Sequence, residues 1–212
     1  MDPITAALKD HYSGTFAEHG ATARGVDWGR DADLALRYDK MLSVIEPSSG
    51  SDNGSSHGIS LLDVGCGYGG LFGHARKRDV AIDYTGIDVV PQMIEHAKET
   101  FPTARFACRD VFDDALSERF DYVVCNGILT QKLTTSIREM DVYAQEMIKR
   151  LFELCRRGVA FNLMTNKVNF MVDNLYYRSP VELLSFCFAE VTDRIKIDHS
   201  YKLYDYTVYL YR

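Results

Sequence analysis

A glycine-rich turn between an apolar segment and a helix pattern constrains the fold of this chain more than any other feature. The segment Ile59 to Val64 is largely apolar, and the six residues after it read Gly-Cys-Gly-Tyr-Gly-Gly. A helical pattern follows from Leu71 to Arg78. Glycine lets a backbone turn sharply and approach a ligand without a Cβ in the way. The sequence therefore predicts a strand, a ligand-holding turn and a helix in succession.

Strand and helix patterns alternate over the rest of the chain. Helices are expected from Pro91 and over 137–155, with Gly158 closing the longer one. The segments 191–197 and 204–211 are strand-like, and since no helix separates them they should form an antiparallel hairpin. Repeated strand–helix units require parallel strands covered by helices on both faces. The expected fold class is therefore α/β, a Rossmann-like doubly wound sheet that is mostly parallel. Its other strands are expected at residues 82–87, 104–107, 120–125 and 159–163.

A run of serine and glycine residues sets the N-terminal part of the chain apart. Residues 47–58 have the composition of a flexible linker. Residues 1–46 carry two helical patterns of apolar residues and are too few to build a core alone. We therefore expect a helical cap over 1–46, a linker over 47–58 and a ligand-binding Rossmann-like domain over 59–212.

Charge and composition restrict the class of partner. The formal net charge is -6 and no block of Lys or Arg stands out, so nucleic acid is not the expected partner. No apolar run approaches the roughly 20 residues that a membrane span needs, and the first residues do not resemble a signal peptide. The five cysteines contain no C-x-x-C pair, so no metal is expected. These features predict a cytoplasmic protein with a small-molecule substrate. It should be a monomer or, through an outer strand at 204–211, a homodimer.

Polar residues stand where four of the expected strands end. Asp63 lies within the first strand, at a position where a dinucleotide fold keeps an apolar residue. Asp88 ends the second strand, where it can accept both hydroxyl groups of a ribose, and Asp110 follows the third, within reach of an adenine amine. Asn126 and Gly127 follow the fourth strand. Since the carboxyl ends of parallel strands open on one crevice, these groups should converge on one ligand.

This arrangement resembles the class I S-adenosylmethionine-dependent methyltransferases, over roughly Ile59 to Arg212. The resemblance implies S-adenosylmethionine as the cofactor, with Asp63 near its ammonium group, Asp88 on its ribose and Asp110 on its adenine. Arg37, in the cap, is a candidate fork for its carboxylate, set against a solvated helix face. The full expected cofactor set is Asp63, Gly65, Cys66, Gly67, Asp88, Val89, Met93, Asp110, Val111, Asn126, Gly127 and Arg37.

Catalysis at a sulfonium needs orientation and a dry, preorganised site more than acid–base chemistry. Aromatic faces also attract a positively charged sulfur. The aromatic candidates are Tyr12, Phe16, Trp28, Tyr176 and Tyr177, with core packing as the alternative for each. The predicted catalytic residues are Tyr176, Asn126, Asn162 and Tyr12. His11 and His199 are the histidines considered as a general base, and no motif fixes either.

Four functions are compatible with these residues. The first is methyl transfer to a small molecule. The second is cyclisation of the cofactor's own amino acid chain, as in the similar azetidine-2-carboxylic acid synthases of secondary metabolism, with release of 5′-methylthioadenosine. The third is a nicotinamide-dependent oxidoreductase, favoured only by the G-x-G-x-x-G spacing of Gly65, Gly67 and Gly70. The fourth is a binding module without catalysis.

Overall fold

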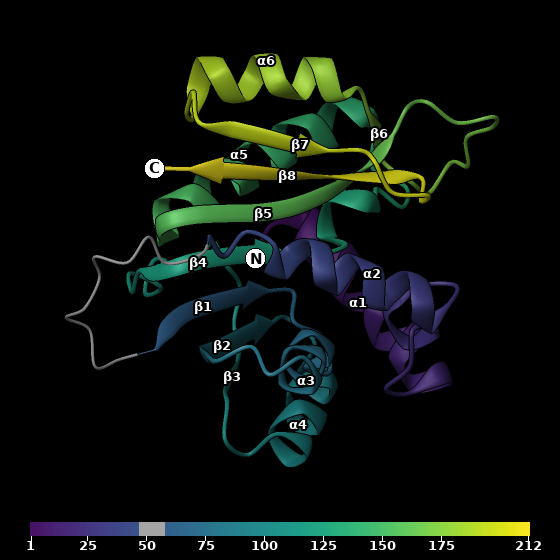
Figure 1. The fold of residues 1–212 in the computed structure, drawn as a ribbon. Coiled ribbons are helices and arrows are strands. Elements are labelled where there is room, and N and C mark those ends of the chain that lie inside the picture. The colour runs from purple at the N-terminus through teal and green to yellow at the C-terminus, as the bar shows by residue number, and fades with distance from the viewer. Residues whose placement is uncertain (47–57) are drawn as a thin grey trace.

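The computed structural model describes residues 1–46 and 58–212, and its centre is one eight-stranded sheet in the order β3-β2-β1-β4-β5-β8-β7, with β6 paired to β5 (Figure 1). Strands β1 to β6 pair in parallel, whereas β8 runs antiparallel to both β5 and β7. This arrangement confirms the predicted fold class. The strands are β1 (Ile59–Val64), β2 (Ile82–Asp88), β3 (Arg105–Cys108), β4 (Phe120–Cys125), β5 (Cys155–Thr165), β6 (Tyr177–Arg178), β7 (Ile195–Asp198) and β8 (Asp205–Tyr211).

Helices cover both faces of the sheet because its strands are apolar on both sides. Leu61 belongs to a core cluster with α2, α3 and α4, whereas its neighbour Leu62 belongs to a cluster with α5 and α6. Tyr122 and Val123 of β4 divide in the same way. This alternation follows from the two-residue period of a strand. The helices are α1 (Pro3–His19), η1 (Arg24–Val26), α2 (Asp31–Leu42), α3 (Gly70–Lys77), α4 (Pro91–Thr100), η2 (Ile128–Thr130), α5 (Ile137–Leu154) and α6 (Pro180–Glu190).

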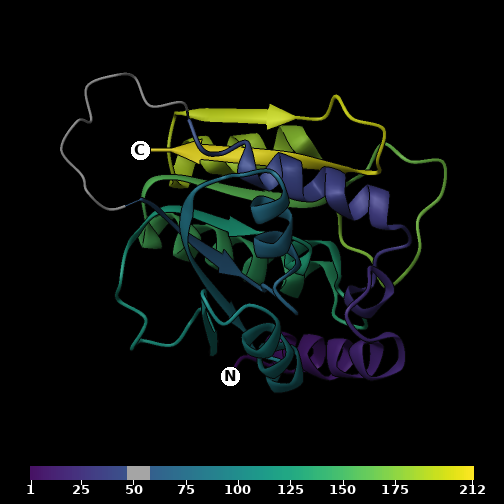
Figure 2. The ribbon, with the colours of Figure 1, turned by 60° about the horizontal axis from the view of Figure 1, so that its bottom comes forward.

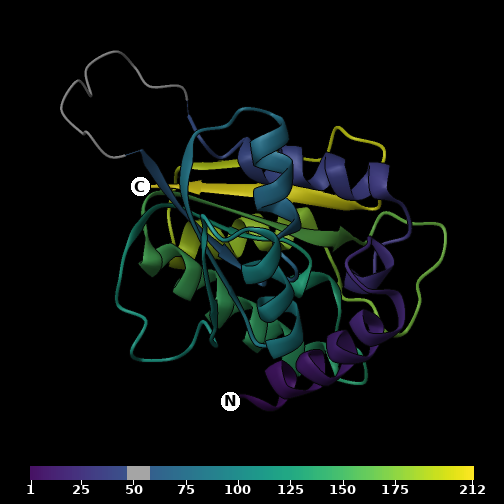
Figure 3. The same cartoon turned by 90° about the horizontal axis from the view of Figure 1, so that it is seen from below.

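The N-terminal helices lie on two sides of the sheet's carboxyl edge. Helix α1 runs close to α4 (Figures 2 and 3), where Phe16 meets the ring of His96. Helix α2 packs against α3 and is bonded to the C-terminal hairpin through Lys40 and Asp198. The helices thus lie where the periodicity predicts them. The division into cap, linker and domain stays a prediction, and all of the predicted linker except Gly58 falls outside the described residues.

Two boundaries differ from the predictions. Gly158 does not close the long helix, since the backbone becomes extended at Cys155 and β5 begins there. The segment 204–211 is not an outer strand either, because β8 lies between β5 and β7. Its residues from Asp205 to Leu210 are all buried, which requires neighbours on both sides. The exposed edge belongs to the short strand β7 instead.

Within the two described ranges, no helix is long and apolar enough to cross a membrane.

Candidate active site

The glycine turn after β1 is anchored to the neighbouring strand. The backbone N–H groups of Gly65 and Cys66 donate to the carbonyl of Ile87, at 2.9 and 3.1 Å. Gly65 has a φ of 75°, and a Cβ there would stand 2.6 Å from the side chain of Ile128. Only glycine meets both conditions without strain. The turn therefore brings bare backbone to the carboxyl edge of the sheet, as the sequence predicts.

Carboxylates from the ends of three strands line one cavity at this edge. Asp88 is held by two backbone donors: its Oδ2 accepts from Gly67 N at 2.8 Å and its Oδ1 from Val90 N at 2.9 Å. Asp63 accepts the hydroxyl of Tyr84 at 2.6 Å. The Oδ1 of Asp110 accepts the backbone N–H of Phe112 at 3.1 Å, which closes the turn after β3. Each carboxylate is thus fixed by the protein and keeps lone pairs for a ligand.

Burial strongly perturbs two of these acids. Desolvation raises the pKa of Asp63 to about 7, against the opposing effect of the Tyr84 hydroxyl. Burial also raises the pKa of Asp88, although the bonds from Val90 and Gly67 favour its charged form. Displaced pKa values of this kind cluster at functional sites. A cationic ligand beside Asp63 would restore its charge.

The cavity has an enclosed volume of about 90 Å³ and opens to solvent. It is lined by every residue of the expected cofactor set except Arg37, and by the aromatic candidates Tyr12 and Trp28. Those lining residues are Asp63, Gly65, Cys66, Gly67, Asp88, Val89, Met93, Asp110, Val111, Asn126, Gly127, Tyr12 and Trp28.

Asn126, a predicted catalytic residue, lines the cavity with a side-chain oxygen that has no hydrogen-bond partner among the described residues. This atom, Oδ1, is buried. A buried acceptor without a partner is costly, and native proteins rarely leave one. Since Asn126 lines the cavity, a donor group on a ligand can satisfy it.

Part of the cavity wall is not predicted from the sequence. Thr5 and Leu8 of α1 face Tyr143 of α5, and the Thr5 and Tyr143 hydroxyls are hydrogen-bonded at 3.2 Å. Leu8 and Tyr143 lie on apolar helical stripes that read as core packing, so no local pattern marks them. The further lining residues missed by the sequence analysis are Val26, Tyr38, Val64, Leu71, Ile87, Val90, Arg109, Ile128 and Met147.

Arg37 lies outside the cavity and is not part of a solvated helix face. It is buried, with 7% of its surface exposed, and its guanidinium forms a bidentate pair with Asp205 at 3.0 Å for both bonds. That fork is therefore engaged within the protein. The alternative of a solvated helix face is wrong, and a contact with the cofactor's carboxylate stays a prediction.

Asn162 and Tyr176 also lie outside the cavity. Asn162 is fully buried and binds the Gly127 N–H and the Asp205 carboxylate, both at 2.8 Å. Tyr176 is 2% exposed, and its hydroxyl donates to Asp141 at 2.6 Å. Each polar group meets its partner away from the residues that line the cavity. That these two residues touch the reacting groups stays a prediction.

The remaining candidates are engaged elsewhere. His11 bonds to Asp27 at 3.1 Å, and the same carboxylate accepts from Gln131 at 2.5 Å. Phe16 stacks on Tyr68. The other two predicted candidates, His199 and Tyr177, are likewise not among the residues that line the cavity.

Comparison with known proteins identifies the family. A family model described as "Methyltransferase domain" matches residues 61–158. The "Putative methyltransferase Rv1506c" of Mycobacterium tuberculosis is 33% identical over 155 residues, which are 71% of this chain and 91% of that protein. The chain belongs to the S-adenosylmethionine-dependent methyltransferases of class I, whose methyl donor is S-adenosylmethionine. This membership makes it a transferase and decides against the nicotinamide alternative.

Solved structures agree on the architecture. The magnesium protoporphyrin IX methyltransferase of Synechocystis, crystallised with bound S-adenosylmethionine, superposes with a TM-score of 0.65 at 16% identity. The match covers 100% of this chain and 98% of that one. A Leishmania major S-adenosylmethionine-dependent methyltransferase gives 0.64 at 16% identity, over 100% of this chain and 85% of that one. At these identities the likeness shows the fold.

Proposed function

We propose that this protein transfers the sulfonium methyl group of S-adenosylmethionine to a small-molecule acceptor. The observation that carries the proposal is the convergence of Asp63, Asp88 and Asp110 on one cavity beside the glycine turn. Turn capping explains each acid alone but not their joint placement on one cavity.

The residues present fit this cofactor. Asp88 offers one oxygen to each ribose hydroxyl, since each oxygen is occupied by only one backbone donor. Asp63 lies where it can pair with the ammonium group, and Asp110 with Val111 flanks the adenine. The free Oδ1 of Asn126 is available to a donor at the reacting end of the ligand.

The protein's own contribution to methyl transfer is orientation in a dry site. When bound, the cofactor supplies an activated methyl group for in-line displacement. Tyr12 and Trp28 from the N-terminal segment present aromatic faces to the cavity. Burial, with Asp27 and Asp88 nearby, raises the pKa of Tyr12, which keeps its phenol neutral. None of the described residues that line the cavity is a histidine or lysine, which favours an acceptor that reacts without such a base.

A second candidate function is cyclisation of the ligand's own amino acid chain. It is supported by the closure of the cavity by α1 and Trp28 and by the free acceptor of Asn126, which can hold an amine. In that reaction a bond forms between the amine nitrogen and the γ-carbon while the bond from the γ-carbon to sulfur breaks. The electron pair of the broken bond stays on sulfur. The ammonium group must lose a proton before it attacks, and the carboxylate of Asp63 in the cavity wall would accept that proton.

Product analysis distinguishes the two functions. Purified protein is incubated with S-adenosylmethionine alone and then with a panel of small-molecule acceptors. Methyl transfer predicts S-adenosylhomocysteine that accumulates only when an acceptor is added. Cyclisation predicts 5′-methylthioadenosine and a four-membered cyclic amino acid without any acceptor. Absence of both products, with no binding of S-adenosylmethionine, would contradict both proposals.

The cytoplasmic location and the monomeric or homodimeric state stay predictions. The burial of β8 removes the strand that the sequence analysis offers as a dimer contact. A monomer is therefore the state we propose. Light scattering on the purified chain measures it directly.

A further inference from the structure

A buried carboxylate outside the cavity is hydrogen-bonded to two residues, each of which contacts a residue of the cavity wall. Asp205 begins β8 and is 0% exposed. Its Oδ2 accepts from Arg37 Nε at 3.0 Å and from Asn162 Nδ2 at 2.8 Å, and its Oδ1 accepts from Arg37 Nη2 at 3.0 Å. The three residues come from β8, α2 and β5, which are far apart in sequence. They are joined at this carboxylate.

One branch of this network leads to the turn after β4. The Oδ1 of Asn162 accepts the backbone N–H of Gly127 at 2.8 Å. Gly127 has a φ of 95°, a conformation that glycine adopts without strain, and the bond from Asn162 selects it among the many that glycine can adopt. The residue before it is Asn126, whose free Oδ1 is the unsatisfied acceptor of the cavity. Asn162 therefore fixes the turn that aims Asn126.

The other branch leads to Trp28. The guanidinium carbon of Arg37 lies 3.7 Å from the centroid of the Trp28 ring. The indole lines the cavity and reaches within 3.2 Å of the place where a Cβ on Gly127 would stand. One branch of the network thus ends at Trp28 and the other at Gly127, and these two residues lie next to each other at the cavity. Lysine cannot replace an arginine of this kind, because it has neither the two-pronged donor group that pairs with a carboxylate nor the planar face that stacks on a ring.

We propose that Asp205 is a positioning residue that, through Arg37 and Asn162, fixes the Trp28 indole against the Asn126–Gly127 turn. None of the three network residues lines the cavity, so their effect on a ligand is transmitted by Trp28 and Gly127. The inference rests on the proposed function only for the identity of the ligand. The geometry of the network does not depend on it.

Trp28 is the only tryptophan of the chain, which makes its fluorescence a specific readout of this network. Asp205→Asn retains the shape of the side chain but leaves the Arg37 charge unpaired. We expect a red shift of the Trp28 emission and stronger quenching by acrylamide. Turnover per folded molecule should fall about tenfold, because small misplacements at a reacting centre are costly. The dissociation constant for S-adenosylmethionine should change less than about threefold, since the cofactor acids lie elsewhere.

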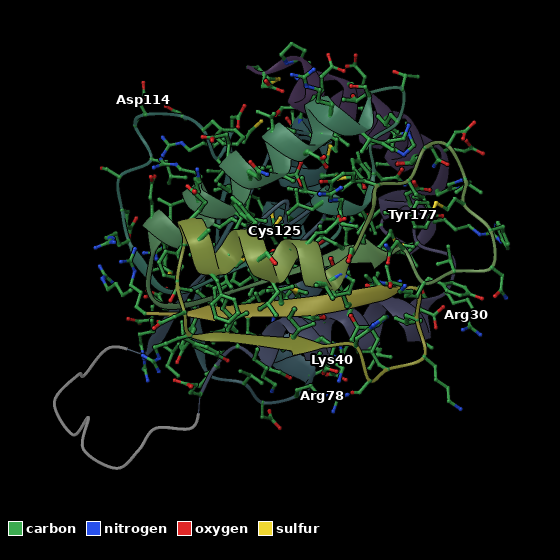
Figure 4. All side chains as sticks on the ribbon, turned by 90° about the horizontal axis from the view of Figure 1, so that it is seen from above. Arg30, Lys40, Arg78, Asp114, Cys125 and Tyr177 are labelled. Carbon is green, nitrogen blue, oxygen red and sulfur yellow. The ribbon has the colours of Figure 1, made fainter. Side chains whose placement is uncertain are left out.

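Asp198→Asn is the matched control. The Lys40–Asp198 pair, at 2.8 Å, also joins α2 to the C-terminal hairpin, beside which Lys40 is labelled in Figure 4. Neither residue lines the cavity, and the ammonium group of Lys40 lies 5.0 Å from the centroid of the Tyr201 ring. This variant should leave the emission, the quenching and the turnover of the wild-type protein unchanged.

Arg37→Lys keeps the charge of the buried pair and tests the inference even where Asp205→Asn does not fold. It removes the fork and the planar stack, so it should shift the Trp28 emission and lower turnover in the same direction. Unchanged emission and quenching in the folded variants would overturn the proposal. So would an equal change in Asp198→Asn. If wild-type protein does not bind S-adenosylmethionine, the proposed function fails, while the fluorescence comparison still decides on the network.

Discussion

The cavity has two sides that are held in different ways. Its floor comprises the glycine turn and the acids Asp63, Asp88 and Asp110, and backbone N–H groups of the same and the neighbouring strand end hold most of it. Its roof comprises the cavity residues of α1 and η1 with Trp28, and it is held by side-chain contacts between distant segments, such as Thr5 with Tyr143. Backbone-anchored groups are fixed when the sheet forms, whereas the roof depends on side chains that can be changed singly. The floor should therefore determine which cofactor binds, and the roof what happens to it.

The largest effect is expected at the floor. Asp88→Ala removes two charged hydrogen bonds to the ribose and leaves the N–H groups of Gly67 and Val90 without their acceptor. The affinity for S-adenosylmethionine should fall about a hundredfold, that is about 3 kcal/mol, by isothermal calorimetry. Asp83→Ala on the same strand is the control, because that exposed residue only pairs with Arg105. Equal affinities for both variants would show that the floor does not select the cofactor.

A roof substitution should affect turnover more than binding. Trp28→Leu retains an apolar wall but removes the aromatic face at the cavity. Loss of the ring that orients the reacting end of the cofactor predicts about a thirtyfold fall in turnover, because small misplacements at a reacting centre are costly. The dissociation constant for S-adenosylmethionine should stay within about threefold, which separates the two sides of the cavity. A variant that loses affinity and turnover equally would contradict this division.

The pH dependence of binding should come from the floor. Asp63 must be ionised to pair with an ammonium group, and its pKa of about 7 in the free protein means that protons compete with the ligand below neutrality. The carboxyl group alone would weaken binding about tenfold from about pH 8 to 6, and protonation of the ligand amine reduces this to about fourfold. Calorimetry across this range measures it. In Asp63→Asn the fall on acidification should disappear.

A small effect on the rate of ligand release is expected where the roof meets α5. Thr5→Val removes the hydrogen bond to the Tyr143 hydroxyl, at 3.2 Å, and keeps the shape of the side chain. The loss of about 1 kcal/mol should raise the dissociation rate of S-adenosylmethionine about fivefold at nearly constant association rate. Stopped-flow measurement of the Trp28 signal detects this change. A Tyr143→Phe variant should give the same result, because it removes the other half of the same bond.

The difference between floor and roof also explains what the sequence could predict. Asp63, Asp88 and Asp110 follow from strand order, since each stands at a fixed place relative to a strand end. The lining role of Thr5, Leu8 and Tyr143 depends on how α1 meets α5, and no local pattern carries that information.

The same reason accounts for the predicted site residues that lie outside the cavity. Arg37 and Asn162 are polar residues in apolar surroundings, which is typical both of ligand contacts and of buried pairs. Their partner Asp205 lies 168 residues from Arg37 and 43 from Asn162, so the pair is visible only in the folded chain. The partner of the Tyr176 hydroxyl, Asp141, lies 35 residues away in the sequence and is likewise visible only in the folded chain.

A crystal structure of the protein with S-adenosylhomocysteine tests the central claim most directly. The account predicts both ribose hydroxyls within about 3 Å of the two Asp88 oxygens, with the sulfur facing Asn126 and the Trp28 indole. An adenosyl group bound away from Asp88, with its ribose bonded to other residues, would contradict it.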